Sequence, residues 1–204
     1  MNMKKSKLFI LSALMLALLL LSFTLSGCFY NGDWTEDGRI RIGYSKMYKK
    51  AFVGALFGDL ENTEFVLPDE YMGYPVTTLG GEIGRGVPNP FDFEIALPEE
   101  YREYVEAQRV FCATDPIFDE TGDGWETVIF KIALGKNIRE IKWAEPCAYY
   151  GIDIDNGDGT ETGDILYKIV PYFTVPEENK TFYAEGGRLY YKESGELAGE
   201  FEYE

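Results

Sequence analysis

The stretch FVLPDEY, residues 65–71, decides the predicted fold. Its first three residues are apolar and favour a short strand. Pro68 ends that strand because proline has no amide hydrogen to give to a strand ladder. The acidic residues that follow favour a turn. One such unit cannot bury its own apolar face, so the pattern predicts neighbouring units stacked against it.

The same pattern returns three times further along the chain. IALPEEY spans residues 95–101, IALGKNI spans residues 132–138 and FTVPEEN spans residues 173–179. Four positions become equivalent in this comparison: Leu67, Leu97, Leu134 and Val175. The steps between them are 30, 37 and 41 residues, which lie in the range of stacked repeat architectures. We expect all four side chains to be buried on neighbouring short strands.

Longer segments around these units resemble the BspA-like leucine-rich repeat. FVLPDEYMGYPVTTLG, residues 65–80, and LGKNIREI, residues 134–141, are similar to its strand, turn and Leu-Gly step. FTVPEENKTFYAEGGRLYYKESGELAGEF, residues 173–201, is similar to the segment after a repeat strand, with a C-terminal hairpin. The resemblance implies surface proteins that act in adhesion or binding, with no catalytic residues to carry over. The glycine-rich stretch 81–86 stands where the family's Ala-Phe step would follow Leu79-Gly80, so we expect an irregular, loop-rich version.

The overall prediction is a β-rich (α+β) fold of irregular leucine-rich-repeat-like units. Residues 45–204 are predicted to form a single extracytoplasmic domain, and residues 28–44, rich in Gly and Asp, a tether that leads into it. The segment from Met47 to Leu60 is the candidate for one N-terminal helix, because apolar residues recur there at helical spacing. The stretch 80–86 lacks the Gly-Lys-Ser/Thr ending of a phosphate loop, so a repeat corner with positive φ angles is expected.

The N-terminus has the three marks of a secretory signal. Three lysines precede an apolar run from Leu8 to Leu25, and the run ends in Leu25-Ser26-Gly27-Cys28. This ending resembles the lipobox of bacterial lipoproteins, which implies cleavage between Gly27 and Cys28. The Cys28 thiol would then carry a diacylglyceryl group, and its amine an acyl chain such as palmitate. We therefore expect a protein anchored by lipid to the extracytoplasmic face of the cell membrane. An uncleaved transmembrane anchor is the alternative, since a largely apolar run of eighteen residues is just long enough to span a bilayer.

Charge excludes some partners. Removing residues 1–27 from the 204 leaves 177 residues, enough for one domain with a real core. The signal holds three Lys and no acid, so the net charge of −16 becomes −19 after cleavage. Such a surface repels nucleic acid and anionic lipid. A solvated acidic head on a lipid tether is the expectation, and a site for cationic ligands is the alternative.

The chain contains no histidine. This removes the commonest general base, the Ser-His-Asp triad and the usual zinc ligand. After lipidation only Cys112 and Cys147 remain, too few for a four-ligand metal site. No cofactor and no metal is expected. A Cys112–Cys147 disulfide is one alternative, but the apolar setting of Cys112 favours two separate, buried thiols.

Acidic loops offer two further hypotheses. The loop Asp153–Gly159 fails the calcium-loop frame, so a solvated turn is expected, with calcium in an irregular oxygen cage as the alternative. Four acids of one glycine-rich loop could supply the acid and the base of a glycoside hydrolase. The alternative is that these side chains are simply solvated. They are Asp119, Glu120, Asp123 and Glu126.

The aromatic doublets at residues 149–150, 172–173 and 190–191 give each strand one inward and one outward ring. The outward rings are candidates for a binding strip, against the alternative of scattered exposure. The leading function is a non-enzymatic surface lipoprotein whose repeat face binds a protein or glycan. A structural envelope lipoprotein without a ligand and a solute-capturing lipoprotein are the alternatives.

Overall fold

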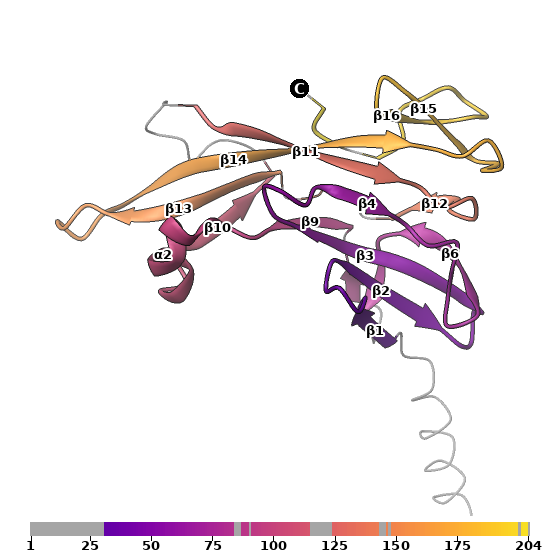
Figure 1. Cartoon of the computed structure of the whole chain (residues 1–204), viewed down its shortest axis with the longest axis horizontal. Helices are drawn as coiled ribbons and strands as arrows, with labels where there is room; N and C mark the ends of the chain where they lie inside the picture. Colours follow the sequence, from indigo (N-terminus) through magenta and orange to yellow (C-terminus); the bar gives the residue numbers. More distant parts are fainter. Residues whose placement is uncertain are drawn as a thin grey trace, which may run out of the picture.

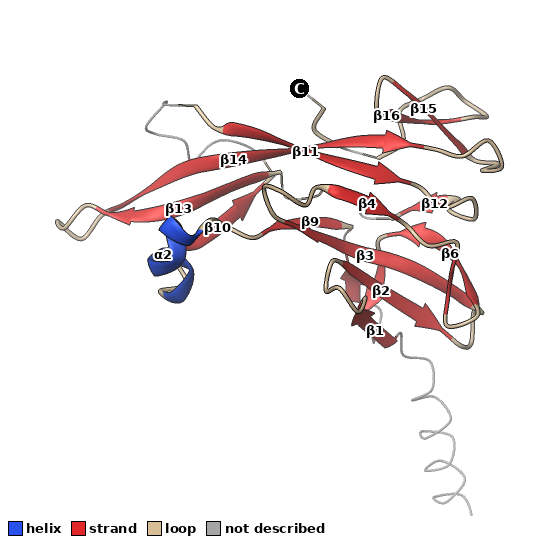
Figure 2. Ribbon diagram, viewed as in Figure 1, coloured by secondary structure: helices blue, strands red, loops and turns tan. Residues whose placement is uncertain are grey.

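The computed structural model of the chain describes residues 31–83, 87–89, 91–114, 124–142, 146, 148–199 and 201–203. Strands dominate it (Figure 2), which confirms the predicted β-rich class. Helical structure within the described residues consists of a 3-10 turn at Glu99–Tyr101 and the short helix α2 (Arg102–Glu106) that follows it. The strands are β1 (Asn31–Trp34), β2 (Ile40–Ser45), β3 (Lys50–Gly58), β4 (Glu64–Val66), β5 (Glu70–Tyr71), β6 (Tyr74–Leu79), β7 (Gly81–Ile83), β8 (Val87–Asn89), β9 (Asp92–Ile95), β10 (Val110–Ala113), β11 (Glu126–Ala133), β12 (Glu140–Ile141), β13 (Tyr149–Asp155), β14 (Glu161–Thr174), β15 (Phe182–Glu185) and β16 (Arg188–Tyr191).

Two sheets contain most of these strands. The seven-stranded sheet has the order β1-β2-β3-β6-β12, with β5 beside β6 and β9 beside β3. The five-stranded sheet has the order β10-β13-β14-β11-β4. Figure 1 shows the five-stranded sheet above the seven-stranded one, with β15 and β16 at the upper right. The pair β15–β16 is the predicted C-terminal hairpin.

Three of the predicted units are stacked in parallel. β11 pairs with β4 on one side and with β14 on the other, and the register places Val66, Ala133 and Thr174 side by side. The residues that follow these three are Leu67, Leu134 and Val175, so the positions aligned in the sequence lie at one level of the stack. The amides of Leu67 and Leu134 continue the ladder, each 2.9 Å from its acceptor carbonyl on the next unit.

Burial agrees with this register. Leu67 and Leu134 are 3% and 4% exposed, and Val175 is half-buried against the same core. Leu97 does not follow the expectation, because it comes after β9, which pairs with β3 in the other sheet. Its side chain is only half-buried. The stack therefore contains three of the four predicted units, and the placement of the Leu97 unit in it is wrong.

A shorter parallel ladder repeats the arrangement in the second sheet. β6 and β12 pair so that Thr78 lies opposite Glu140 and Leu79 opposite Ile141. The first unit thus runs from β4 to β6 and the second from β11 to β12, each passing from one sheet to the other. The turn between β4 and β6 contains Pro68, which was predicted to end its strand, and Gly135 takes the corresponding place between β11 and β12.

The core lies between the two sheets and is rich in phenylalanine. Phe65 and Phe130 come from neighbouring strands of the stack, with ring centroids 5.0 Å apart. Phe93 of β9 reaches Phe130 at 5.7 Å, and Phe201 reaches Phe93 at 6.2 Å. Full burial of one such side chain stabilises the fold by about 1.5–3 kcal/mol. The C-terminal segment is therefore part of the core.

A buried asparagine holds the turns of the stack together. Asn179 is fully buried, and its side-chain amide donates to the carbonyls of Gly135 at 3.1 Å and Ile138 at 2.8 Å. Its Oδ1 accepts the amides of Thr181 and Phe182, both at 2.9 Å. One side chain thus satisfies four backbone groups on two successive turns, as buried backbone groups require.

Asp69, in the turn of the first unit, links that turn to the turn of the second unit. Asp69 accepts the amide of Lys136 at 2.7 Å, and Lys136 Nζ lies 3.1 Å from the second oxygen of Asp69. The side chain of Asn137 donates to the Asp69 carbonyl at 3.1 Å. The acidic residues predicted as simple turn formers therefore also link consecutive turns.

The start of the chain differs from the predictions. Residues 28–44 were expected to be a tether, but β1 and β2 lie within them, and Ile42 is fully buried. The domain therefore includes residue 31, and the predicted boundary at residue 45 is wrong. The candidate helix from Met47 to Leu60 is instead the strand β3, because a central strand buried on both faces carries a continuous apolar run.

The corner after β6 agrees with the glycine pattern. Gly80 has φ +74°, and a Cβ at this position would meet the carbonyl oxygen of Lys142. Glycine is therefore required both by the backbone conformation and by the close approach of the next turn. Gly84 and Gly86 lie outside the described residues.

Candidate functional site

Side chains alternate across the stack formed by β4, β11 and β14. Phe65, Ile132 and Phe173 point inward, and each is at most 2% exposed. The residues between them point to solvent, and we call this surface the outer stack face. It consists of Glu64, Val66, Ile129, Lys131, Val170 and Tyr172.

Three large apolar side chains are exposed on this face. Val66 is 76% exposed, Ile129 is 48% exposed and Tyr172 is 44% exposed. They come from three adjacent strands, and the register places Tyr172 opposite Lys131, Val66 two residues further along and Ile129 two residues back. Single exposed apolar residues are ordinary on protein surfaces, but several gathered on adjacent strands are typical of an interaction site.

An ion pair occupies the middle of the outer stack face. In the strand register Lys131 lies between Glu64 and Tyr172, and its Nζ is 2.8 Å from Glu64 Oε1. The hydrogen bond lowers the pKa of Glu64 and raises the pKa of Lys131. Both side chains are largely exposed, so the pair adds little to folding stability. It instead offers a donor and an acceptor, flanked by apolar groups, to a ligand.

The aromatic doublets contribute less to this face than predicted. Tyr172 is exposed and Phe173 buried, as the alternation requires. Tyr149 and Tyr150 are both buried, because Trp125 covers the outward ring of Tyr149 at a centroid distance of 5.3 Å. Tyr190 is half-buried and stacks on Tyr183 of the same hairpin at 5.2 Å. A continuous aromatic strip is therefore absent from the described strands.

A second surface joins aromatic and acidic groups on the seven-stranded sheet. Trp34 and Phe57 are 36% and 37% exposed and pack edge to face at 6.3 Å. The guanidinium of Arg41 lies 5.8 Å from the Trp34 ring. Glu94 is adjacent to Phe57 in the register. Burial and, to a lesser extent, the nearby Asp92 raise the pKa of Glu94, while Arg41 opposes the shift.

This second surface was not found in the sequence. Its residues come from β1, β2, β3 and β9, and no motif links them. The alternation of side chains along each strand could assign these residues to a common face only once the pairing of β3 with β9 was known. The apolar side chains of the outer stack face are more exposed than Trp34 and Phe57, and we take this face as the principal candidate.

The acidic loop Asp153–Gly159 covers the end of β13 and most of the turn that leads into β14. Asp155 accepts the amide of Gly157 at 2.8 Å, and Asp158 accepts the amide of Thr160 at 2.9 Å. Hydrogen bonds within the turn lower the pKa of both carboxyl groups. Their oxygens are thus engaged in shaping the turn. Among the described residues, no three acids, cysteines or histidines gather as a metal site would require.

The candidate hydrolase acids are mostly outside the described part of the chain. Asp119, Glu120 and Asp123 lie there, and Glu126 is exposed at the start of β11. The acid pair therefore stays a hypothesis.

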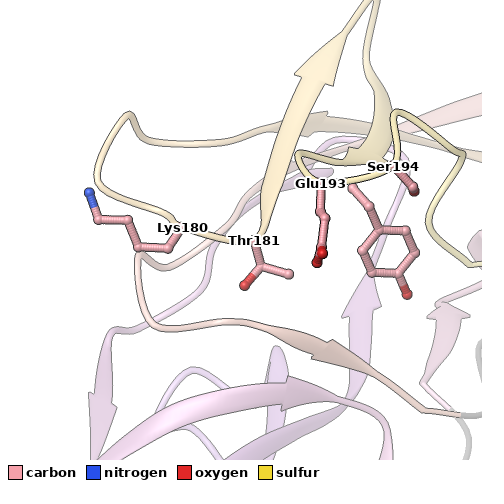
Figure 3. Close-up of a pocket in the computed structure, with 5 residues that line it drawn as sticks. Lys180, Thr181, Glu193 and Ser194 are labelled. Atoms are coloured by element: carbon pink, nitrogen blue, oxygen red, sulfur yellow. The ribbon is translucent and has the colours of Figure 1, made fainter.

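Two small hollows are lined by described residues. One, drawn in Figure 3, has a volume of about 220 Å³ and is lined by Lys180, Thr181, Tyr191, Glu193 and Ser194. In Figure 3 the amine of Lys180 extends away from the Glu193 carboxylate. The other, near Arg109 and Asp155, has a volume of about 170 Å³. Sites for small molecules usually measure about 300–1,000 Å³, so neither hollow has the size of a typical solute pocket.

Cys112 and Cys147 are the residues of the candidate disulfide. Cys112 is half-buried on β10 and is disulfide-bonded, so the expectation of a free, buried thiol there is wrong. Its candidate partner Cys147 lies outside the described residues, as do Gly27 and Cys28. Within the described part of the chain, no helix has the length and apolar character to cross a membrane.

Comparison of the chain with protein-family models, curated proteins and solved structures gave no match. The resemblance to leucine-rich repeats therefore rests on the quoted motifs and stays a prediction.

Proposed function

We propose that this protein is a non-enzymatic lipoprotein, anchored at the extracytoplasmic face of the membrane, that binds a protein or glycan through its outer stack face. The observation that carries the proposal is the group of exposed side chains Val66, Ile129 and Tyr172 around the Glu64–Lys131 ion pair. Tyr172 also packs its ring on Gly187 of the C-terminal hairpin, whereas Val66 and Ile129 are 76% and 48% exposed at solvent-facing positions of the stack. A ligand that covers them would gain about 25 cal/mol per Å² of apolar surface removed from water.

The mixture of groups on this face favours a protein or glycan ligand. A tyrosine ring gives a broad apolar contact with a polar edge, as in many interfaces. The ion pair beside it can exchange its hydrogen bonds for those of a ligand amide or hydroxyl at little cost to the fold. The hollows of about 220 and 170 Å³ give less support to solute capture.

Binding is tested with paired variants of equal chemistry. Val66→Ser and Ile129→Ser together remove two exposed apolar groups from the outer stack face. Val105→Ser and Leu197→Ser remove side chains that are 50% and 47% exposed elsewhere, and serve as the matched control. The mature protein and both double variants are immobilised and presented with host surface proteins and with a glycan array.

We expect capture by the unaltered protein and the control, and loss of capture in the outer-face variant. Equal capture by all three proteins would exclude the outer stack face. Failure of the unaltered protein to capture any ligand would favour a structural role in the envelope.

The anchor is tested separately. Cys28→Ala should abolish labelling by radioactive fatty acid and leave an unprocessed or released chain. Mass spectrometry of the unaltered mature protein should find a lipidated N-terminal residue 28. A different mature start, or lipid on the Cys28→Ala chain, would contradict the anchor.

A further inference from the structure

The lipid anchor, if present, is attached very close to one end of the seven-stranded sheet. Cys28 precedes Asn31, the first residue of β1, by three residues. Three extended residues span at most about 11 Å. Asn31 pairs with Tyr44, one residue before the end of β2. The turn from β2 into β3 therefore lies beside the point where the chain leaves the membrane.

That turn exposes apolar and basic side chains together. Lys46, Met47, Tyr48 and Lys49 form it, and all four are exposed. Met47 is 60% exposed and Tyr48 is 57% exposed. Burial inside the domain therefore does not explain these two apolar side chains.

A second turn brings another methionine to the same end. The ring of Tyr44 lies 6.1 Å from that of Tyr71 and 5.8 Å from that of Tyr74, which flank the turn from β5 into β6. Met72 stands in this turn and is 65% exposed. Among the described residues, four large hydrophobic side chains are more than half exposed, and Met47, Tyr48 and Met72 are three of them.

The charge of this end is opposite to that of the chain. Residues 45–50 contain three lysines and no acid, although the whole chain carries −16. Lys50 Nζ lies 4.0 Å from Glu140, which offsets its charge. Lys46 and Lys49 form no ion pair with any described residue. Glu70 of β5 brings one carboxylate to this end, and the two lysines outnumber it.

From this geometry we infer that Lys46, Met47, Tyr48, Lys49 and Met72 form a membrane-docking tip that seats the domain on an anionic lipid surface beside its anchor. The inference rests on the proposed lipid anchor at Cys28. Methionine and tyrosine side chains enter the interfacial region of the bilayer, where tyrosine is enriched. Each lysine near an anionic surface contributes about 1 kcal/mol. The strongly acidic remainder of the surface is repelled by the same lipids, so docking through the tip fixes the orientation of the domain.

Methionine oxidation reads out this docking directly. The chain has five methionines, of which Met1, Met3 and Met15 belong to the signal, so the mature protein contains only Met47 and Met72. Val105→Met adds a distant reference on α2, which lies at the left of Figure 1, whereas β2 and β3 lie at the right. The lipidated V105M protein is reconstituted in vesicles of phosphatidylcholine alone or mixed with phosphatidylglycerol. Hydrogen peroxide is added, and mass spectrometry gives the oxidation rate at each methionine.

On mixed vesicles we expect Met47 and Met72 to be oxidised more slowly, relative to the reference, than on phosphatidylcholine alone. Lys46→Gln with Lys49→Gln should weaken the docking equilibrium by about 30-fold, from about 1 kcal/mol per lysine. The protection should then be lost. Lys180→Gln, a single exposed lysine on the turn before β15, is the control and should leave the protection unchanged.

Vesicle flotation separates the two ways to fail. Protein that floats with lipid on Cys28, yet oxidises Met47 and Met72 at the same relative rate on both vesicles, overturns the docking tip and leaves the anchor intact. Equal protection on both vesicles that survives K46Q with K49Q overturns the role of anionic lipid. Protein that carries no lipid and does not float overturns the anchor, and the docking inference with it.

Discussion

Replacing Asn179 with alanine should destabilise the domain more than its small volume suggests. The side chain is fully buried and makes four hydrogen bonds to backbone groups of two successive turns. Asn179→Ala leaves the carbonyls of Gly135 and Ile138 without this donor. The amides of Thr181 and Phe182 lose their acceptor. The stack would then lack the side chain that joins its second turn to its third.

The magnitude follows from these four groups. A buried polar group left without a partner costs about 1–3 kcal/mol. Gly135 O also accepts the amide of Ile138 at 3.3 Å, so this carbonyl keeps a partner. A water molecule that enters the small cavity can satisfy part of the remainder. We therefore expect a loss of about 3–4 kcal/mol in the free energy of unfolding, at the upper end of single substitutions.

Urea unfolding followed by tryptophan fluorescence measures this loss as a lower midpoint at an unchanged slope. Asn137→Ala is the matched control, since its side chain is half-buried and donates to the Asp69 carbonyl. It should cost about 0.5–1.5 kcal/mol. Asn179→Asp keeps the shape but turns a carboxylate toward two carbonyls, so its deficit should shrink as acid protonates it. A cost for Asn179→Ala no larger than that of Asn137→Ala would refute the reasoning.

Three other predictions concern burial, charge and redox state. Leu134→Ala should cost about 2–5 kcal/mol by urea unfolding, whereas Leu97→Ala should cost clearly less because Leu97 is only half-buried. The folded chain raises the pKa of Glu94, which disfavours its charged form, so Glu94→Gln should stabilise the domain slightly near pH 7, by under about 1 kcal/mol. That gain should vanish as the pH falls below the ordinary pKa of Glu, and a gain that persists there would contradict it. Cys112 should be found joined to Cys147 by peptide mapping without reductant, and reduction should cost about 3–4 kcal/mol for a loop of about 35 residues. Two free thiols in the unfolded mature chain would exclude that bridge.

The parallel stack could be predicted because each unit carries its own boundary. Pro68 follows Leu67 and Gly135 follows Leu134, so the end of each apolar run can be seen in the sequence. Packing also favours a glycine at position 135, since a Cβ there would make a tight contact of 3.0 Å with the Pro68 carbonyl oxygen. At these two turns the sequence prediction and the structure agree, because the residue after each strand also lies against the neighbouring turn.

The Leu97 unit shows the limit of local patterns. IALPEEY shares Leu, Pro, Glu and Tyr with FVLPDEY at the same four positions. The strand that leads into it, β9, nevertheless pairs with β3 in the other sheet. Partner choice depends on what the strand packs against, and Phe93 of β9 reaches Phe91 and Phe130 in the core. A pattern of seven residues specifies a strand and its end, but not its neighbour.

The error at β3 has a related cause. Phe52, Leu56 and Leu60 recur at helical spacing, but the residues between them are also apolar. A short apolar run fits a strand buried on both faces as well as a helix. β3 takes the strand form because β2, β6 and β9 supply partners along both of its edges.

The outer stack face was only partly predictable for a similar reason. Alternation on β14 assigns Tyr172 to the outside, and the structure agrees. The same rule assigns Tyr149 to the outside of its strand, yet Trp125 covers it there. Alternation gives the direction of a side chain. Exposure depends on which remote segment covers that face.

The two proposed surfaces occupy different parts of the molecule, so each can be altered without the other. The docking tip lies at the end of the seven-stranded sheet where β1 begins, and the five-stranded sheet lies on the other side of the core (Figure 1). A domain seated on the tip therefore holds its outer stack face away from the membrane, where a ligand can reach it. It follows that K46Q with K49Q changes the orientation at the membrane but not the intrinsic affinity of the outer stack face. V66S with I129S has the reverse effect. A single ligand-binding surface that also contacted lipid would instead link the two sets of variants, and capture and methionine protection would then be lost together.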